Sequence, residues 1–395
     1  MSGMHDGGVA IAGAAETDEV GLLPEHSALA LGFEAARNAL DDAGLDWSDV
    51  DGFATTLQQP YEAAHYLGID PRWTDGTNIG GCSYLAHVRH AAAAITAGAA
   101  TVVLVVHGES GRSRVGGPSY AFGTNSPVGQ FEYTQGLIPP NLVLGLPVLR
   151  FLHERGMSRR DLAEVVVAQR EWAALNPRAL KRTPTTVEEV LNSKPNAYPF
   201  TTDMCCLVTD GGAAVVVTTA ERARNLKRAA TPVTLIGSGE RVDSMMTAQV
   251  PDATEMHAVK ESGREAFATS GLTPGDIDHL MIYDAFASIP LYGLENLGFT
   301  GPGESGAFVA DGHTRPGGRL PLNTNGGGLN YTHTGMYGMF AIVEAVRQLR
   351  GDAAAQVPGV ETSFIQGIGM MHAAAASLVL TNAVTDPSNR PRHVQ

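Results

Sequence analysis

A repeated order of elements is the feature that most constrains how this chain can fold. Residues 34–51 have the pattern of a helix that stops at Gly44 and leads through a short capped turn into a strand. Residues 265–278 repeat this pattern, with the stop at Gly271. An apolar, β-prone segment precedes each helix, at residues 9–14 and 233–237. The repetition predicts that the chain folds as two duplicated βαβ-type halves.

Three further apolar runs predict strands that are buried on both faces. They are residues 101–106, 213–218 and 377–380. Residues 111–198 interrupt this order, because they are rich in Gly, Pro, Ser and Asn at first and then become helical. In the helical part, Ser158 and Asp161 have the spacing of a capping box. This pattern predicts an inserted lobe over one half, where ligand-covering elements often lie.

We therefore expect the chain to divide into four parts. The N-terminal half comprises residues 1–110 and 199–228, and the inserted lobe comprises residues 111–198. The C-terminal half comprises residues 229–385, and a polar tail of residues 386–395 follows it. Each half is expected to direct its strands toward a central sheet.

The composition excludes several classes of function. The 395 residues are 44% hydrophobic and 17% charged, as in ordinary soluble globular proteins. The formal net charge of −14 argues against broad binding to nucleic acid or to anionic membranes, because both need basic faces. The three cysteines lack the spacing of a disulfide scaffold, which indicates a reducing compartment. Residues 1–19 lack the features of a secretory signal, and no apolar stretch approaches the ~20 residues of a membrane-spanning helix, so we expect a cytoplasmic protein.

Two distant segments carry side chains that could react. Residues 80–83 read Gly-Gly-Cys-Ser and directly precede a helix-like run, residues 84–97. A cysteine at a helix N-terminus, here Cys82, is expected to have a lowered pKa because the helix dipole favours the thiolate. The second segment, residues 323–335, is glycine-rich and carries His333. An imidazole beside the thiol could take or return a proton near pH 7.

Several motifs, taken together, indicate a family. They are Gly80-Gly81-Cys82-Ser83, His107-Gly108-Glu109-Ser110, Thr209-Asp210-Gly211-Gly212-Ala213-Ala214, Tyr283-Asp284-Ala285-Phe286, Asn325 to His333 and Gly367-Ile368-Gly369. With them the chain resembles the thiolase superfamily over nearly its whole length. More narrowly, it resembles the thiolase-like sterol-carrier/lipid-transfer branch, which is acetyl-CoA acetyltransferase-like and related to steroid side-chain aldolases. The resemblance implies an α/β protein with the five-layered αβαβα thiolase fold, built from two duplicated βαβ-type halves with an inserted lobe, and a homodimer.

The resemblance also implies roles for single residues. Cys82 matches the nucleophilic cysteine of the family, although the same residue type is often only a small buried apolar side chain. His333 matches the histidine of a Gly-His-Pro turn, with Thr334 in place of the proline. His333 would polarise the thioester oxygen, and backbone N–H groups at Gly81 and Gly369 would help to stabilise the oxyanion.

Two positions depart from the thiolase pattern. Tyr283 stands where the family has an asparagine, and Ile365 stands about where it has a second cysteine. Because Ile365 cannot act as an acid or a base, Tyr283 or Tyr331 is expected to manage the proton that the second cysteine would handle.

The remaining polar residues give weaker signals. Arg112, Arg114 and Arg182 of the inserted segment could bind the phosphates of coenzyme A, since guanidinium groups suit phosphate. His87 and His90 have the i, i+3 spacing of metal ligands, but no carboxylate or cysteine partner is evident nearby. We interpret both as packing residues and expect no metal site. The chain also lacks the dinucleotide-binding, Walker and zinc-finger patterns.

The residues together with the family resemblance leave three functions open. The favoured one is a thiolase-like acyl-CoA enzyme that makes or breaks a C–C bond beside a thioester, with acyl transfer through Cys82 and His333. The second is a retro-aldolase on β-hydroxyacyl-CoA side chains, in which a tyrosine deprotonates the hydroxyl, Cys82 is structural, and a partner subunit with an OB fold and a zinc ribbon helps to build the site. The third is a non-catalytic thiolase-fold scaffold. For both enzymes the substrate is a coenzyme A thioester and the protein holds no bound cofactor; the acyl chain stays open.

Overall fold

One mixed sheet runs through the computed structural model, which describes residues 4–56, 58–116, 123–138, 140–228, 230–370 and 373–383. Within these residues the strand order is β3-β2-β4-β5-β1-β6-β9-β8-β7. The strands of the first half are β1 (Val9–Glu16), β2 (Gly52–Ala54), β3 (Trp73–Asp75), β4 (Val102–Ser110) and β5 (Asp210–Thr219). Those of the second half are β6 (Val233–Val242), β7 (His279–Ile282), β8 (Thr362–Gly369) and β9 (Ala374–Thr381). All five apolar segments of the sequence overlap strands, whereas the predicted polar tail lies outside the described residues.

The two halves repeat one pairing scheme. In the first half, β5 pairs antiparallel with β1 and β4, and β2 pairs parallel with β4. In the second half, β9 pairs antiparallel with β6 and β8, and β7 pairs parallel with β8. A short antiparallel pairing of β1 with β6 joins the halves. The predicted duplication is therefore confirmed in the topology of the sheet.

Matching glycines mark the duplication at single residues. The two outer helices are α1 (Ala28–Ala43) and α9 (His257–Ser270). They end at Gly44 and Gly271, whose left-handed φ values of 72° and 73° favour glycine. Register shifts occur at Gly13 in β1 and at Gly237 in β6. A Cβ atom at either position would overlap a carbonyl oxygen of the helix that packs on it. Because glycine has no Cβ atom, both helices can pack close to the sheet.

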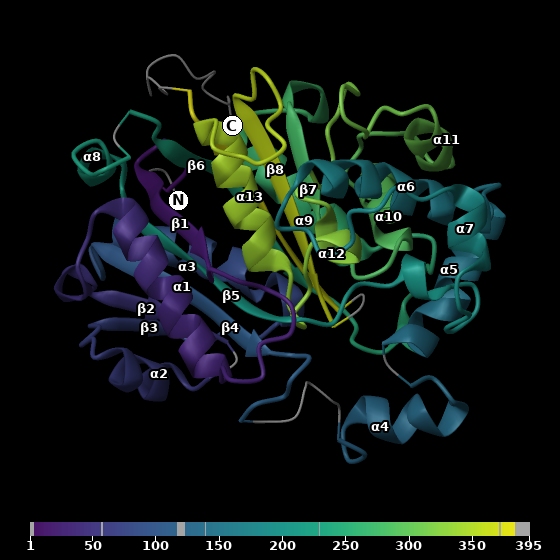
Figure 1. Cartoon of the computed structure of the whole chain (residues 1–395), viewed down its shortest axis with the longest axis horizontal. Coiled ribbons are helices and arrows are strands. Elements are labelled where there is room, and N and C mark those ends of the chain that lie inside the picture. The colour runs from purple at the N-terminus through teal and green to yellow at the C-terminus, as the bar shows by residue number, and fades with distance from the viewer. Residues whose placement is uncertain are drawn as a thin grey trace.

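Four helices complete the five layers. α1 packs on β1, β4 and β5, and α9 packs on β6 and β9. Between the two sets of strands lie α3 (Ser83–Thr96) and α13 (Gly338–Arg350), which both contact strands of both halves (Figure 1). Nearly every residue of α13 is buried, as expected of a helix that is covered on all sides. The predicted αβαβα order is thus confirmed.

The described residues of the segment 111–198 are mainly helical and form a lobe that contacts the second half. Its helices are α4 (Pro127–Phe131), α5 (Asn141–Glu154), α6 (Arg159–Leu175) and α7 (Val187–Asn192). Ser158 caps α6 and forms the predicted capping box with Asp161. The neighbours of α6 are α7, α10 (Ser288–Asn296), α11 (Ser305–Ala310) and α12 (Gly327–Asn330). Figure 1 accordingly shows α5, α6 and α7 grouped with α10 and α11, whereas α2 (Pro60–Leu67) and α8 (Ala220–Ala223) lie beside the first half.

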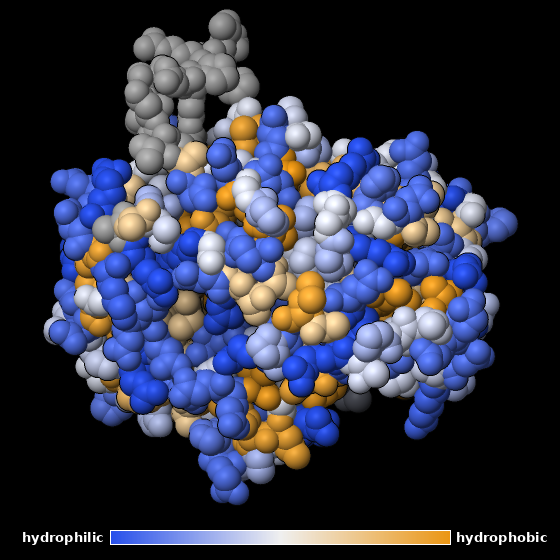
Figure 2. Space-filling view, turned by 45° about the horizontal axis from the view of Figure 1, so that its top comes forward, coloured by the Kyte–Doolittle hydropathy of each residue, from blue (hydrophilic) through white to orange (hydrophobic). Residues whose placement is uncertain are grey.

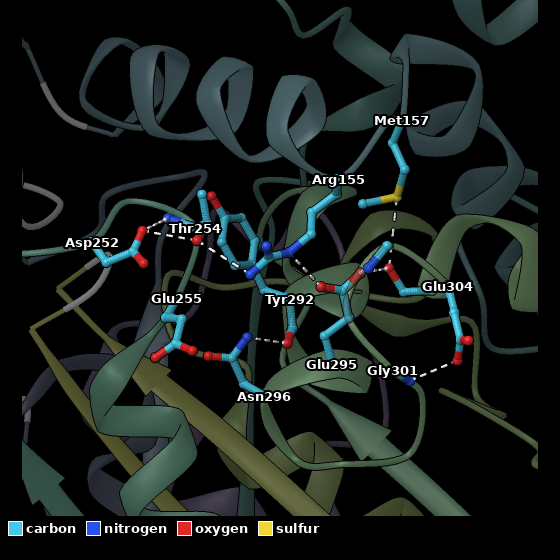
Figure 3. A network of polar contacts seen from close by, with 12 residues as sticks. Arg155, Met157, Asp252, Thr254, Glu255, Tyr292, Glu295, Asn296, Gly301 and Glu304 are labelled. Atoms are coloured by element: carbon cyan, nitrogen blue, oxygen red, sulfur yellow. Dashed lines mark hydrogen bonds and ion pairs between the residues drawn. The ribbon is translucent and has the colours of Figure 1, made fainter.

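An ion pair fixes the lobe to the second half (Figure 3). Arg155 follows α5 and donates to Glu295 of α10 over 3.0 Å and to Thr254 over 3.2 Å. Glu295 also accepts from the backbone N–H of Gly303 and the hydroxyl of Ser305. The side chain of Glu295 is only 3% exposed, and the guanidinium of Arg155 is the cation that the lobe places beside this buried carboxyl group.

The outer surface is mostly hydrophilic on the face drawn in Figure 2, where hydrophobic patches lie between hydrophilic residues. In the part of the chain that the structure describes, no helix is both long and apolar enough to cross a lipid bilayer.

Candidate active site

Three segments that are distant in sequence meet at one end of the central sheet. Tyr283 directly follows β7, and its backbone N–H donates to the carbonyl oxygen of Gln366 on β8 over 3.0 Å. The 3₁₀ turn Gly80–Cys82 leads into α3 and packs against Gly369 at the end of β8. The loop 331–337 connects α12 to α13. The structure thus brings the two reactive segments of the sequence to the same place.

Tyr283 and His333 form the centre of this site. The Tyr283 hydroxyl lies 3.0 Å from Nε2 of His333 and 3.4 Å from the carbonyl oxygen of Gly335. The two rings meet edge to face, and both side chains are buried. Burial lowers the pKa of His333 to about 4 and raises the pKa of Tyr283 well above its usual range. Near neutral pH both groups are therefore uncharged, and they can exchange a proton along one hydrogen bond.

Gly81 faces this pair without a side chain. A Cβ atom at Gly81 would lie only 2.5 Å from the hydroxyl oxygen and from Cζ of Tyr283. The Tyr283 ring thus occupies the space into which a side chain on residue 81 would point. A nucleophile on residue 81 and the observed position of Tyr283 exclude each other sterically.

The structure corrects the predicted lowering of the Cys82 pKa. Cys82 is fully buried, its thiol donates to the carbonyl oxygen of Ile79 over 3.3 Å, and it packs against Gly367 and Gly369 of β8. Burial raises the pKa of this thiol, and the charge of Glu240 raises it further. The helix dipole was expected to favour the thiolate, but desolvation outweighs it here. Cys82 is a buried thiol in the core rather than an activated thiolate.

The second predicted tyrosine belongs to a different cluster. The Tyr331 hydroxyl donates to Glu16 over 2.5 Å, and this carboxylate also forms ion pairs with Arg178 and Arg347. Burial, followed by the charge of Glu16, raises the pKa of Tyr331. Tyr331 therefore supports the loop that carries His333, rather than sharing a hydrogen bond with it.

Tyr337 is the tyrosine that packs against Tyr283. Their ring centroids are 5.7 Å apart in an edge-to-face arrangement. The Tyr337 hydroxyl donates to Oδ1 of Asn325 over 2.7 Å, which ties the loop to the glycine-rich segment. As for Ile365, the structure places it inside β8, where it pairs with Met281 and Leu378, while Gly367 and Gly369 are the residues of β8 beside Cys82.

A buried polar chain behind the site escaped the sequence reasoning. Thr334, the residue in place of the family's proline, hydrogen-bonds through its hydroxyl to Nε2 of His107 over 2.7 Å. Nδ1 of His107 lies 2.7 Å from the hydroxyl of Tyr84 on α3. Burial, and after it the charge of His333, lowers the pKa of His107 to about 3, so its imidazole is neutral. The motif His107-Gly108-Glu109-Ser110 was the available signal, but only the fold places it behind the His333 loop.

Asp284 holds the glycine-rich segment in place. Its carboxyl group accepts from the backbone N–H groups of Gly328 and Leu329, over 2.7 and 3.2 Å, at the start of α12. A Cβ atom at Gly327, whose φ is 69°, would overlap this carboxyl group, which explains the glycine. Burial raises the pKa of Asp284 to about 8. Asp284 thus positions the turn that leads to His333.

The other candidate residues lie outside this centre. Arg112, Arg114 and Arg182 are exposed, and their role toward coenzyme A stays a prediction. His87 contacts the carbonyl oxygen of Thr77, but His90 has the carboxylate neighbours that the sequence did not reveal. They are Asp75 and Glu240, at 2.7 and 2.8 Å. Among the described residues, no group of three or more His, Cys, Asp or Glu side chains is placed to hold a metal ion.

Comparison with known proteins finds relatives that cover most of the chain. A family model described as thiolase C-terminal domain-like matches residues 239–382. A 17-hydroxy-3-oxo-4-pregnene-20-carboxyl-CoA lyase of Mycobacterium tuberculosis is 38% identical over 371 residues, 91% of this chain and 95% of the lyase. An acetyl-CoA acetyltransferase of Methanothermobacter thermautotrophicus is 32% identical and covers 85% of this chain and 90% of its own.

Solved structures extend the similarity to the whole fold. A structure described as an Ltp2–ChsH2(DUF35) aldolase superposes with a TM-score of 0.87 at 32% identity, covering 95% of this chain and 98% of that chain. The similarity to this structure therefore extends over nearly the whole chain. The chain belongs to the thiolase superfamily, in the thiolase-like sterol-carrier/lipid-transfer branch that includes steroid side-chain aldolases.

Proposed function

We propose that this chain is a retro-aldolase, which cleaves the bond between the α and β carbons of a β-hydroxyacyl-CoA thioester. The observation that carries this proposal is the Tyr283 ring in the space before Gly81. The ring fills the direction in which residue 81 would project a side chain into the site, and the thiol of the neighbouring Cys82 faces the core with a raised pKa. Acid–base chemistry by Tyr283 and His333 is the reactivity that remains.

The reaction begins with proton transfer along the Tyr283–His333 hydrogen bond. The phenol oxygen of Tyr283 accepts the proton of the substrate hydroxyl, while the phenol's own proton passes to Nε2 of His333. This transfer requires that the neutral imidazole of His333 carries its proton on Nδ1. Burial disfavours the imidazolium in the empty site, but an enolate forming beside it favours that charge. The pair is thus a base that acts only when the thioester develops negative charge.

Bond cleavage follows, and its atoms and electrons balance. The Cα–Cβ bond breaks, the β carbon becomes a carbonyl carbon, and the electron pair moves into the thioester as an enolate. Backbone N–H groups of the Gly81 and Gly369 loops would stabilise the enolate oxygen. A proton then binds to Cα and replaces the one that the hydroxyl lost. The sequence requires neither an oxidant nor a covalent acyl-enzyme.

The similar lyase suggests the class of substrate. In a 17-hydroxy-pregnene-20-carboxyl thioester, the hydroxyl-bearing carbon 17 is bonded to carbon 20, which is the α carbon. Retro-aldol cleavage would therefore release a 17-ketone and propionyl-CoA. We propose a steroid side-chain thioester of this class as the substrate, with Arg112, Arg114 and Arg182 as candidates for binding the phosphates of coenzyme A.

We further propose that the chain acts as a homodimer with a DUF35-type subunit that carries an OB fold and a zinc ribbon. The support is the similarity to the Ltp2–ChsH2(DUF35) aldolase, whose description pairs two components. The partner would complete the substrate site rather than supply Tyr283 or His333.

The experiment is a product analysis with and without the partner. The chain, alone and mixed with a DUF35 subunit, is incubated with the 17-hydroxy steroid thioester, and products are separated by liquid chromatography and mass spectrometry. Equal amounts of the 17-ketone and propionyl-CoA are expected, with activity lost in Tyr283→Phe and retained in Cys82→Ala. No cleavage under either condition would refute the proposal.

Thiolase-type acyl transfer is the second candidate, favoured by the similarity to the acetyl-CoA acetyltransferase. It requires Cys82 to leave the core and attack a thioester. Intact-protein mass spectrometry after incubation with acyl-CoAs distinguishes the two. An acyl adduct that disappears in Cys82→Ala would establish acyl transfer, whereas cleavage without any adduct supports the retro-aldolase.

A further inference from the structure

A buried carboxyl group behind the Tyr283–His333 pair has no part in the steps above. Glu109 is the penultimate residue of β4, and its side chain is only 9% exposed. Its Oε2 has no hydrogen-bond partner among the described residues. An unsatisfied carboxylate oxygen in such a place is costly, so the neutral acid is the favoured form.

Gly335 places Glu109 next to the proposed base. The carboxyl group occupies the space where a Cβ atom of Gly335 would lie, with Oε2 at 2.6 Å from that position. The carbonyl oxygen of the same glycine accepts from the Tyr283 hydroxyl over 3.4 Å. Burial is the main cause of the raised Tyr283 pKa, and Cys206 and Glu109 would raise it further in their ionised forms. Two proton carriers therefore lie on either side of one glycine.

The surroundings of Glu109 keep it protonated without immobilising it. Burial raises the pKa of Glu109 to about 8, Asp210 of β5 adds to the increase, and the Thr334 hydroxyl and Met336 N–H oppose it. The other titratable groups that face this region are the neutral His107 behind Thr334 and the hydroxyl of Tyr84. None of these supplies the cation that would hold Glu109 as a carboxylate.

We propose that Glu109 is the acid that protonates the α carbon of the enolate, the second proton carrier of the retro-aldol reaction. The inference deepens the proposed function and rests on it. The O–H bond of Glu109 breaks as the Cα–H bond forms, and the carboxylate then recovers the proton that His333 received from the substrate hydroxyl. The site thereby returns to its neutral state. This is the acid–base task that Ile365 cannot perform.

The test is the reverse half-reaction, because an acid that protonates a carbon must also remove a proton from it. Propionyl-CoA is incubated in deuterium oxide with the chain and its DUF35 partner, and loss of the α proton is followed by NMR. Glu109→Gln keeps the shape and the hydrogen-bonding capacity of the neutral acid but cannot transfer a proton. Exchange is expected to slow by ~100-fold or more in this variant.

Glu132 supplies a matched control. It is also buried, its Oε1 accepts from the N–H of Ala248 over 2.9 Å, and its Oε2 is likewise unpartnered among the described residues. Glu132→Gln should exchange at the rate of the wild type. Glu109→Asp, which retains an acid on a shorter side chain, should keep measurable exchange and serves if Glu109→Gln does not fold.

The outcomes separate this inference from the proposed function. Wild-type exchange that persists in Glu109→Gln would overturn the role of Glu109 and leave the retro-aldolase intact. A wild type that cleaves the steroid thioester but exchanges no α proton would also overturn it, because solvent would then protonate the carbon. Absence of both cleavage and exchange would refute the two proposals together.

Discussion

The hydroxyl of Tyr283 lies 3.0 Å from Nε2 of His333, in a site where both side chains are buried. Burial lowers the pKa of the imidazole to about 4 and raises that of the phenol, so the resting pair is neutral. A neutral pair costs little to bury, and in the proposed mechanism it acts as a base only when a bound thioester accepts electrons. This relationship underlies the first prediction.

Replacing Tyr283 by Phe should remove activity without unfolding the protein. The ring would still fill the space before Gly81, but the proton path to His333 would be lost. We expect kcat for thioester cleavage to fall by ~10²–10⁴-fold, with KM changed only a few-fold. Steady-state kinetics and a melting curve check both statements.

Tyr331→Phe is the matched control. Its hydroxyl bonds to Glu16 in the cluster with Arg178 and Arg347, so its loss should reduce stability by about 1–2 kcal/mol. The folded variant should keep most of its kcat. Equal losses of kcat in the two variants would contradict the assignment of the proton path to Tyr283.

A methyl group at Gly81 should displace Tyr283, the proposed base. The Cβ atom of Gly81→Ala would lie 2.5 Å from the Tyr283 hydroxyl oxygen, far inside van der Waals contact. Since overpacking a buried site costs ~1–3 kcal/mol, we expect both a lower melting temperature and at least ~10-fold lower kcat. Gly275→Ala, where a Cβ atom would meet Thr273 at an ordinary 3.7 Å, should leave kcat unchanged. A fully active Gly81→Ala variant would show that Tyr283 can move away without consequence.

His90 should make stability depend on pH in the alkaline range. Hydrogen bonds to Asp75 and then Glu240 raise the pKa of His90 to about 9 from a usual value of 6.5. The protonated ring therefore stabilises the fold fully below about pH 6.5, and this contribution is lost as the pH rises through about 9. Because the His90 side chain is 32% exposed, we expect its protonated form to contribute only about 1–2 kcal/mol to the free energy of unfolding.

Urea unfolding of wild type and His90→Gln, at several pH values between about 6 and 10, measures this term. The difference in unfolding free energy should be largest at the acidic end and should shrink toward the alkaline end. His65→Gln, at an exposed position on α2, is the control and should show no such trend. A difference that grows with pH would have the wrong sign for this ion-pair arrangement.

Loss of Arg155 should loosen the lobe. Its partner Glu295 is 3% exposed, so Arg155→Ala would leave a buried carboxylate without its cation, at a cost of ~3 kcal/mol. The exposed pair of Arg150 and Glu154, in the last turn and a half of α5 just before Arg155, offers a control, and Arg150→Ala should cost less than ~0.5 kcal/mol. Hydrogen exchange over α5–α7 should rise in Arg155→Ala alone. Equal effects of the two changes would mean that the buried pair does not anchor the lobe.

Much of the fold could be predicted because its signals are local. Gly44 and Gly271 end their helices in the left-handed conformation that glycine favours, and the capping box of Ser158 starts α6. The apolar runs of β4 and β5 lie in the middle of the sheet, where strands are covered on both faces. His333 and Tyr283 were likewise assigned from motifs, and the structure joins them by a hydrogen bond.

The chemistry of the glycine–cysteine turn could not be predicted in the same way. Residues 81 and 82 are neighbours, yet their side-chain directions differ: one faces Tyr283 and the other faces Gly367 and Gly369 of β8. The pKa of Cys82 depends on burial by strands that follow it by more than half the chain. No local pattern encodes that desolvation.

The sequence by itself determined the duplicated order of helices and strands, the inserted lobe and the segments that carry reactive side chains, because hydrogen-bonding periodicity, capping and turn conformation act over a few residues. Only the tertiary structure decided which of these side chains meet. In the folded chain the Tyr283 ring packs against Gly81, the Cys82 side chain points into the core, and the Glu109 carboxyl group packs against Gly335. These outcomes follow from steric exclusion and from desolvation, and both are imposed by segments far apart in the chain.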